Sequence, residues 1–125
     1  MDEPPLLVVD AANVIGSVPD GWWRDRAGAA ARLRDALAGV ATAGLPGLPP
    51  PLEVVLVVEG AARATGDVPG IRVVAADGSG DDTIVDLVRA AGSRRRVVVV
   101  TADRGLRERV AALGADVFGP RAVPR

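Results

Sequence analysis

Four short apolar runs rich in valine most constrain the fold of this 125-residue chain. The runs are continuous rather than alternating, which is typical of strands that are buried on both faces in a parallel sheet covered by helices. They occupy residues 6–9, 54–58, 71–76 and 97–100, and residues 116–118 form a shorter fifth candidate. We therefore expect a mostly parallel central sheet of about five strands.

Segments with helical periodicity separate these runs. Apolar residues at three- and four-residue spacing predict one helix over residues 23–40, a second that opens with Asp81 and Asp82, and a third that follows Asp103. This alternation of strands and helices indicates a three-layer α/β/α fold. A chain of this length supports one hydrophobic core, so we expect residues 1–125 to form a single domain.

The residue types that are absent exclude many mechanisms. The chain has no Cys and no His, and all 15 of its basic residues are Arg. Thiolate sites, imidazole catalysis and lysine chemistry are therefore excluded, and any chemistry must rest on carboxylates, assisted by a metal ion or a substrate phosphate. The formal net charge of −1 excludes a surface coated in positive charge, although it allows a local basic patch.

The sequence also lacks an evident export or membrane segment. It begins with Met1, Asp2 and Glu3, which is acidic where a signal peptide is basic. The apolar runs are far shorter than the roughly 18 residues that a membrane span needs. We therefore expect a cytoplasmic protein with no membrane partner.

Acidic residues follow each of the four main strands. Asp10 follows the first strand, Glu59 the second and Asp103 the fourth, while a glycine-rich loop that ends in Asp81 and Asp82 follows the third. Parallel strands deliver their carboxyl ends to the same edge of a sheet, where ligands bind. We therefore expect these acids to lie near one another.

Helix periodicity distinguishes the two adjacent acids. Asp81 shares a helix face with Ile84 and Val85, so we expect it, rather than Asp82, to point into the site. Ordinary structural roles remain open for these acids, because Asp81, Asp82 or Asp103 could cap a helix and Glu59 could be a solvated strand end.

A group of carboxylates favours a divalent cation, since their charges otherwise repel one another. Oxygen ligands of this kind suit Mg²⁺ or Mn²⁺ rather than zinc. Such an ion can activate water and stabilise the oxyanion that leaves a phosphodiester. The acids therefore predict hydrolysis of a phosphate ester.

Three sequence blocks carry most of these acids. They read Val-Asp-Ala-Ala-Asn-Val-Ile-Gly at residues 9–16, Gly-Asp-Asp-Thr-Ile-Val at 80–85 and Thr-Ala-Asp-Arg-Gly-Leu-Arg at 101–107. In order and spacing they resemble the signature motifs of NYN domains, in the PIN-like nuclease superfamily, and within it the YacP-like branch of bacterial endoribonucleases. The resemblance covers nearly the whole chain.

The resemblance implies a metal-dependent endoribonuclease that uses Mg²⁺ or Mn²⁺ to cut single-stranded RNA or loops. It makes Asp10, Asp81 and Asp103 the metal-binding catalytic acids, Asp82 an auxiliary acid and Asn13 an amide that orients the site. It also implies that Thr101 hydrogen-bonds within the turn that presents Asp103. Glu59 stands where Asp is more usual and is a further candidate ligand.

Several arginines and one tryptophan are candidate substrate contacts. The planar guanidinium can hold a phosphate with two hydrogen bonds. Two adjacent tryptophans on a helix point about 100° apart, so we expect one to pack and the other to remain accessible for stacking on a base. By contrast, we expect residues 94–96 to form a solvated turn at the opposite edge of the sheet. The candidate contacts are Arg24, Arg104, Arg107, Thr101 and Trp22.

Other functions remain open at this point. A catalytically weak or inactive module of the same fold could bind RNA or the ribosome, and the sequence leaves a homodimer open. A Toprim-like domain is suggested by Glu59, but the fourth strand supplies only one of the two acids that it needs. A dinucleotide-binding domain is disfavoured, because the glycine-rich loop follows the third strand rather than the first.

Overall fold

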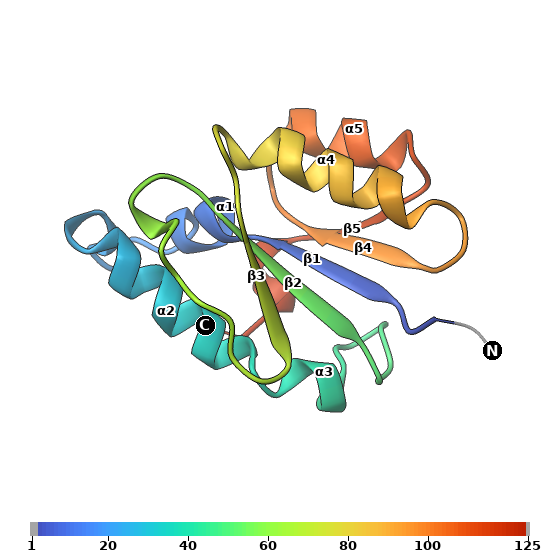
Figure 1. Ribbon diagram of the computed structural model, residues 1–125, viewed down its shortest axis with the longest axis horizontal. Coiled ribbons are helices and arrows are strands. Elements are labelled where there is room, and N and C mark those ends of the chain that lie inside the picture. Colours follow the sequence, from blue (N-terminus) through green and yellow to red (C-terminus); the bar gives the residue numbers. More distant parts are fainter. Residues whose placement is uncertain (1–2, 125) are drawn as a thin grey trace.

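The predicted strands form one parallel sheet in residues 3–124, the part of the chain that the computed structural model describes (Figure 1). The strand order is β3-β2-β1-β4-β5, and every neighbouring pair is parallel. The described residues do not include Met1, Asp2 and Arg125. The start of the predicted acidic N-terminus and both ends of the predicted single domain therefore lie outside them. The strands are β1 (Leu6–Asp10), β2 (Glu53–Val58), β3 (Ile71–Ala75), β4 (Val97–Val100) and β5 (Asp116–Phe118).

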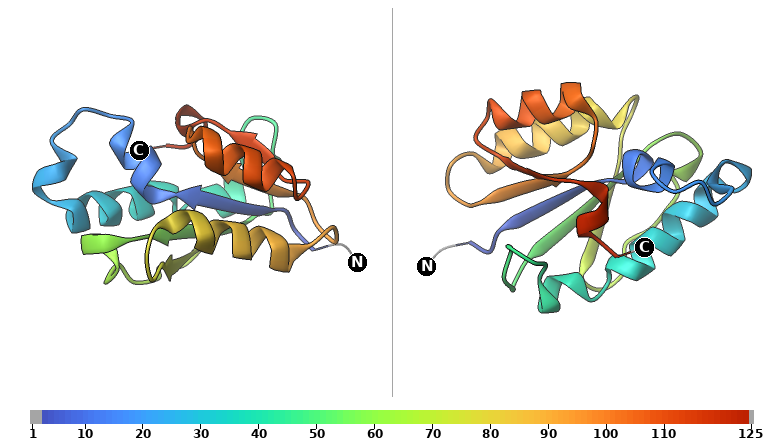
Figure 2. Two further views of the ribbon diagram at one scale, coloured as in Figure 1. Left: turned by 90° about the horizontal axis from the view of Figure 1, so that it is seen from above. Right: turned by 180° about the vertical axis from the view of Figure 1, so that it is seen from behind.

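Helices cover both faces of the sheet, which confirms the α/β fold with three layers (Figure 1; Figure 2). One face packs against α1 (Ala11–Gly16), α2 (Arg26–Leu37) and α3 (Val40–Ala43). The other packs against α4 (Gly80–Ala91) and α5 (Arg104–Ala111). Within residues 3–124, no helix combines the length and the apolar character that crossing a bilayer requires.

The two apolar layers explain why the strand sequences are continuous rather than alternating. Successive side chains of a strand point to opposite faces. In β1, Leu7 and Val9 therefore pack with the α1–α3 layer, and Leu6 and Val8 pack with the α4–α5 layer. All five residues of β1 are buried, as expected for the central strand of a sheet covered on both sides.

The first predicted helix is wrong at its N-terminus. Trp23 lies in a short 3₁₀ turn (Trp22–Arg24), and α2 begins only after Asp25, whose side chain accepts a hydrogen bond of 2.9 Å from the backbone N–H of Gly28. Asp25 is thus the N-cap that sets the start of the helix. The helix ends at Leu37, and the four residues of α3 form a separate turn.

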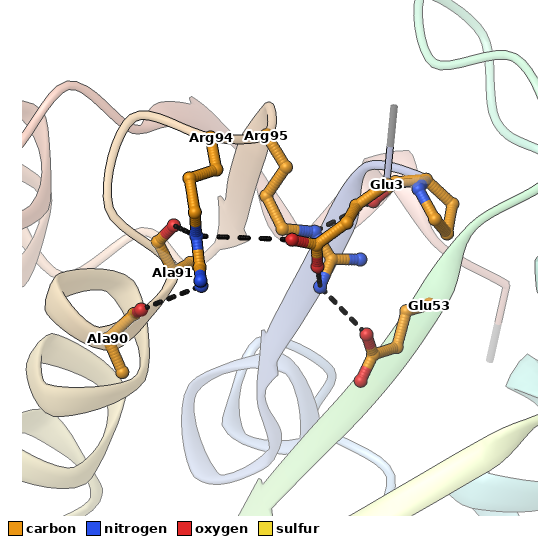
Figure 3. Close-up of polar contacts among 7 residues, drawn as sticks. Glu3, Glu53, Ala90, Ala91, Arg94 and Arg95 are labelled. Atoms are coloured by element: carbon orange, nitrogen blue, oxygen red, sulfur yellow. Dashed lines mark hydrogen bonds and ion pairs between the residues drawn. The ribbon is translucent and has the colours of Figure 1, made fainter. Parts of the chain in front are cut away.

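The predicted solvated arginine turn before β4 is present for Arg94 and Arg96, which are exposed, but the prediction is wrong for Arg95. The side chain of Arg95 is only 8% exposed. Its Nε donates to the carbonyl of Pro4 (2.8 Å), and its Nη1 donates to Glu53 (2.9 Å) and forms an ion pair with Glu3 (3.3 Å; Figure 3). The groups that hold this arginine come from distant segments, so the local sequence gives no sign of them.

Candidate active site

Asp10 is the last residue of β1 and is 6% exposed. By strand alternation it shares the face of Leu6 and Val8, the side on which α4 packs. Its Oδ1 accepts a hydrogen bond from the backbone N–H of Asn13 (3.4 Å), which makes Asp10 the N-cap of α1. Its Oδ2 accepts from the hydroxyl of Thr101 (2.9 Å), the residue that follows β4.

The turn after β4 is fixed by hydrogen bonds to side chains. The Thr101 hydroxyl accepts from the backbone N–H of Asp103 (3.1 Å), so the hydrogen bond predicted within this turn is present. The side-chain carbonyl of Asn13 accepts from the backbone N–H of Ala102 (2.8 Å). Asn13 and Thr101 therefore connect the ends of β1 and β4. Their hydrogen bonds fix the conformation of the turn that presents Asp103.

Asp103 is the N-cap of α5. Its Oδ1 accepts from the backbone N–H of Leu106 at 2.8 Å, which is the ordinary role of aspartate at this position. Within residues 3–124, its Oδ2 accepts no hydrogen bond. Capping leaves this second oxygen free to act as a ligand.

Glu59 follows β2 and holds the first residue of α4. Its Oε2 accepts from the backbone N–H of Gly80 at 2.5 Å. Ser79, at the N-cap position, makes no capping hydrogen bond through its side chain. A Cβ atom on residue 80 would lie 2.9 Å from the same Glu59 oxygen, so glycine allows this approach. The alternative of a merely solvated strand end is therefore wrong for Glu59.

The two acids at the start of α4 differ as predicted. Asp81 is half-buried and shares the helix face of Ile84 and Val85, both of which belong to the core. Asp82 is exposed, and its carboxylate accepts from Arg109 of α5 at 3.0 Å. Asp82 thus has a cationic partner at the surface, which separates it from the inward-facing Asp81.

The acids influence one another electrostatically. The pKa of Asp10 is raised to about 6, mainly by burial and to a lesser extent by the charges of Asp81 and Glu59, against the opposing hydrogen bonds from Thr101 and Asn13. Burial also raises the pKa of Asp81, with Asp103, Glu59 and Asp82 adding to the effect and Arg109 opposing it. We call Asp10, Glu59, Asp81 and Asp103 the acidic cluster.

The acidic cluster offers the oxygen donors that Mg²⁺ and Mn²⁺ prefer. Within residues 3–124, no three acidic side chains lie close enough to hold one cation together. Mg²⁺ is usually held by only one or two carboxylates, with waters and substrate phosphate oxygens as its remaining ligands. The residues present could hold such an ion through a pair of carboxylates such as Asp10 and Asp81, but the predicted metal-binding acids Asp10, Asp81 and Asp103 do not form a closed protein cage.

The prediction that Thr101 contacts the substrate is wrong, because this residue is fully buried. The other candidate substrate residues fall into two groups. Arg104 and Arg107 are exposed in the first turns of α5, directly after Asp103. On the other side of the acidic cluster, the guanidinium of Arg24 lies 5.7 Å from the ring of Trp23, which is 52% exposed. Trp22 is half-buried. The two tryptophans therefore differ in exposure, as the sequence predicts.

A cavity of about 270 Å³ connects Trp22 to the acidic cluster. Arg26, which the sequence offers beside Arg24 as a candidate phosphate contact, also lines it, with its guanidinium 5.3 Å from the centre of the Trp22 ring. Only the placement of α1 reveals this cavity, and α1 is too short to leave a periodic signal in the sequence. The lining residues are Ala11, Ala12, Ile15, Trp22, Arg26, Glu59, Gly60 and Ala62.

These features define an α/β chain with an acidic site at the carboxyl edge of a parallel sheet. No protein-family model matches the chain, and no curated protein matches it significantly. Its fold is similar to that of Rae1 (YacP) from Bacillus subtilis, with a TM-score of 0.74 and 20% identity over 98% of this chain and 71% of that one. A mutant of the same protein matches with a TM-score of 0.70 and 21% identity, over 98% and 72% of the two chains. The fold is thus shared with a YacP protein.

Proposed function

We propose that this chain is a metal-dependent endoribonuclease of the YacP-like branch of NYN domains, in the PIN-like superfamily. The observation that carries the proposal is the acidic cluster at the edge of the sheet where ligands bind. There the charges of Asp81 and Glu59 help to raise the pKa of Asp10, and those of Asp103 and Glu59 help to raise the pKa of Asp81. Perturbed carboxylates in such a place are typical of functional sites. The three motif blocks and the fold shared with Rae1 (YacP) support the same assignment.

In this proposal each residue has a distinct role. Asp10 and Asp81 bind Mg²⁺ or Mn²⁺, and the free Oδ2 of Asp103 accepts a hydrogen bond from a water ligand of the ion, because no third acid in residues 3–124 converges on it directly. Asn13 and Thr101 orient the turn after β4, and Glu59 fixes the start of α4. The bound ion supplies an activated water and stabilises the leaving oxyanion.

The exposed arginines of α5 bind the RNA in this proposal. Arg104 directly follows Asp103 and Arg107 lies one helical turn further on, so a phosphate that reaches the acidic cluster also lies near the start of α5. The guanidinium geometry suits a phosphodiester oxygen pair. We therefore assign these two arginines to the RNA backbone.

A second function is favoured by one observation. The absence of three converging acids in residues 3–124 is what an RNA- or ribosome-associated binding module with a weak metal site would also show. The two proposals differ in whether an ion binds saturably and whether RNA is cleaved.

Cleavage of single-stranded RNA in Mn²⁺ or Mg²⁺ tests the nuclease. Asp81→Asn and Asp103→Asn should each lower the rate on the order of a thousandfold, since a bound ion contributes several kcal/mol to the transition state. Asp86→Asn is the matched control, because Asp86 lies on the same helix and, among residues 3–124, pairs only with exposed Arg89. Undiminished cleavage by both site variants would overturn the nuclease, and RNA binding without saturable Mn²⁺ binding would favour the binding module.

A further inference from the structure

We propose that the cavity beside the acidic cluster binds a single nucleobase of the RNA and prefers a base with an exocyclic amino group. This inference rests on the proposed function, because it places the base next to the phosphate that the acidic cluster acts on. It makes Trp22 the stacking platform and Glu59 the residue that selects the base.

The cavity has the right position and size. Ala11 and Ala12, which line it, directly follow Asp10 in the chain, and Glu59 belongs both to its wall and to the acidic cluster. Its volume of about 270 Å³ is slightly below that of pockets for drug-sized ligands, which start at roughly 300 Å³. The space thus suits one planar ring system and excludes a base pair.

The aromatic wall is held in place before any ligand arrives. The ring of Trp22 contacts Trp23 edge to face, with centroids 6.0 Å apart and an interplanar angle of 86°. The guanidinium of Arg26 lies 5.3 Å from the Trp22 ring centre and lines the same cavity. Nucleobases stack on both kinds of planar group, and one base on an aromatic ring contributes about 1–3 kcal/mol.

Among the side chains that line the cavity, Glu59 is the one that accepts hydrogen bonds, whereas Arg26 donates. Glu59 uses its Oε2 to hold Gly80, and within residues 3–124 its Oε1 has no hydrogen-bond partner. An ionised carboxylate can only accept. It therefore matches the amino group of cytosine, as glutamate does when it reads that base in DNA, and it repels the carbonyl oxygen that uracil presents at the same position.

Titration with nucleosides tests the site directly by NMR. Cytidine carries no phosphate, so the acidic cluster does not repel it. The measurement therefore needs no metal ion and involves no cleavage. The chain has two tryptophans, so its spectrum contains two indole N–H signals, which Trp22→Phe and Trp23→Phe assign. We expect cytidine to shift the Trp22 signal saturably, with a Kd of about 1 mM. A shift confined to Trp23, or no saturable shift, would overturn the proposal.

Base selection is tested with uridine, which matches cytidine in size. One hydrogen bond to a charged group corresponds to about a tenfold preference for cytidine. Glu59→Gln keeps an oxygen for the backbone N–H of Gly80 but adds an N–H donor. Cytidine and uridine should therefore bind this variant with about equal affinity, and both should still shift the Trp22 signal. Equal affinities in the unaltered protein, or an unchanged preference in Glu59→Gln, would overturn the selection by Glu59.

The two proposals fail separately. A protein that binds cytidine at Trp22 but leaves RNA intact in Mn²⁺ keeps the base site and loses the nuclease. A protein that cleaves RNA in an Asp81-dependent way, but whose Trp22 signal does not move, keeps the nuclease and loses the base site.

Discussion

The two edges of the sheet use the same residue types in opposite ways. At the amino edge, the arginines before β4 face acids and carbonyls: Arg95 contacts Glu3, Glu53 and Pro4, and Arg96 bonds to Asp116 (Figure 3 for Arg95). At the carboxyl edge, Asp10 is buried without a cationic partner among residues 3–124. One edge is balanced in charge and the other is not.

This difference separates stability from function. Balanced, hydrogen-bonded charges hold chain segments together, whereas buried carboxylates of like sign oppose folding until a cation or a proton neutralises them. Natural proteins accept such a loss of stability where activity requires it. Removing a charge should therefore have opposite effects on stability at the two edges.

The largest effect on stability is expected at the amino edge. Arg95→Ala removes a largely buried guanidinium that bonds to two carboxylates and a backbone carbonyl, and it should lower the free energy of unfolding by about 3 kcal/mol. Urea denaturation measures the change. Arg94→Ala is the control, because that side chain is 66% exposed, and it should cost less than about 1 kcal/mol. Equal effects of the two variants would contradict the structural role of Arg95.

At the carboxyl edge the sign reverses. The pKa of Asp10 is raised from 3.8 to about 6, so between these values the folded protein binds more protons than the unfolded chain and loses stability as the pH rises. Asp10→Asn removes this loss and should raise the free energy of unfolding by about 2 kcal/mol at pH 7 in metal-free buffer. The gain should vanish as the pH falls well below 3.8, because Asp10 is then protonated in both the folded and the unfolded state. A variant less stable than the parent at pH 7 would refute the unfavourable burial of Asp10.

The smallest effect is expected for the ion pair that borders the acidic cluster. Asp82 and Arg109 lie 3.0 Å apart, but their side chains are 80% and 46% exposed. Exposed pairs contribute little, so Arg109→Gln should change the free energy of unfolding by less than about 0.5 kcal/mol. If Arg109→Gln lowered the free energy of unfolding as much as Arg95→Ala does, this ion pair would stabilise the fold like the charges at the amino edge.

The sequence predicts the strands well because the signal is local. A strand segment buried on both faces is apolar at successive positions, and β1, β2 and β4 each contain such a run of four or five residues, at 6–9, 54–58 and 97–100. Helix boundaries are harder, since Trp23 continues the apolar spacing of α2 although Asp25 caps the helix after it. The six residues of α1 cover less than two helical turns and leave no periodic signal.

Within the site, the sequence predicts which residues gather but not what each one holds. Parallel topology alone brings Asp10, Glu59, Asp81 and Asp103 to one edge. The Thr101 to Asp10 hydrogen bond spans 91 positions of the chain, and the Glu59 to Gly80 bond spans 21. Side-chain reach over such separations depends on the three-dimensional placement of the strand ends, which no spacing rule encodes.

The central claim is that Asp10 and Asp81 share a divalent cation. Anomalous diffraction from a crystal soaked in Mn²⁺ tests it most directly, because the signal locates the ion and identifies its ligands. We expect a peak bonded to carboxylate oxygens of Asp10 and Asp81, and its loss in crystals of Asp81→Asn. The shared site would be contradicted if saturating Mn²⁺ gave no anomalous peak at this edge of the sheet, or if the ion bound only to other acids.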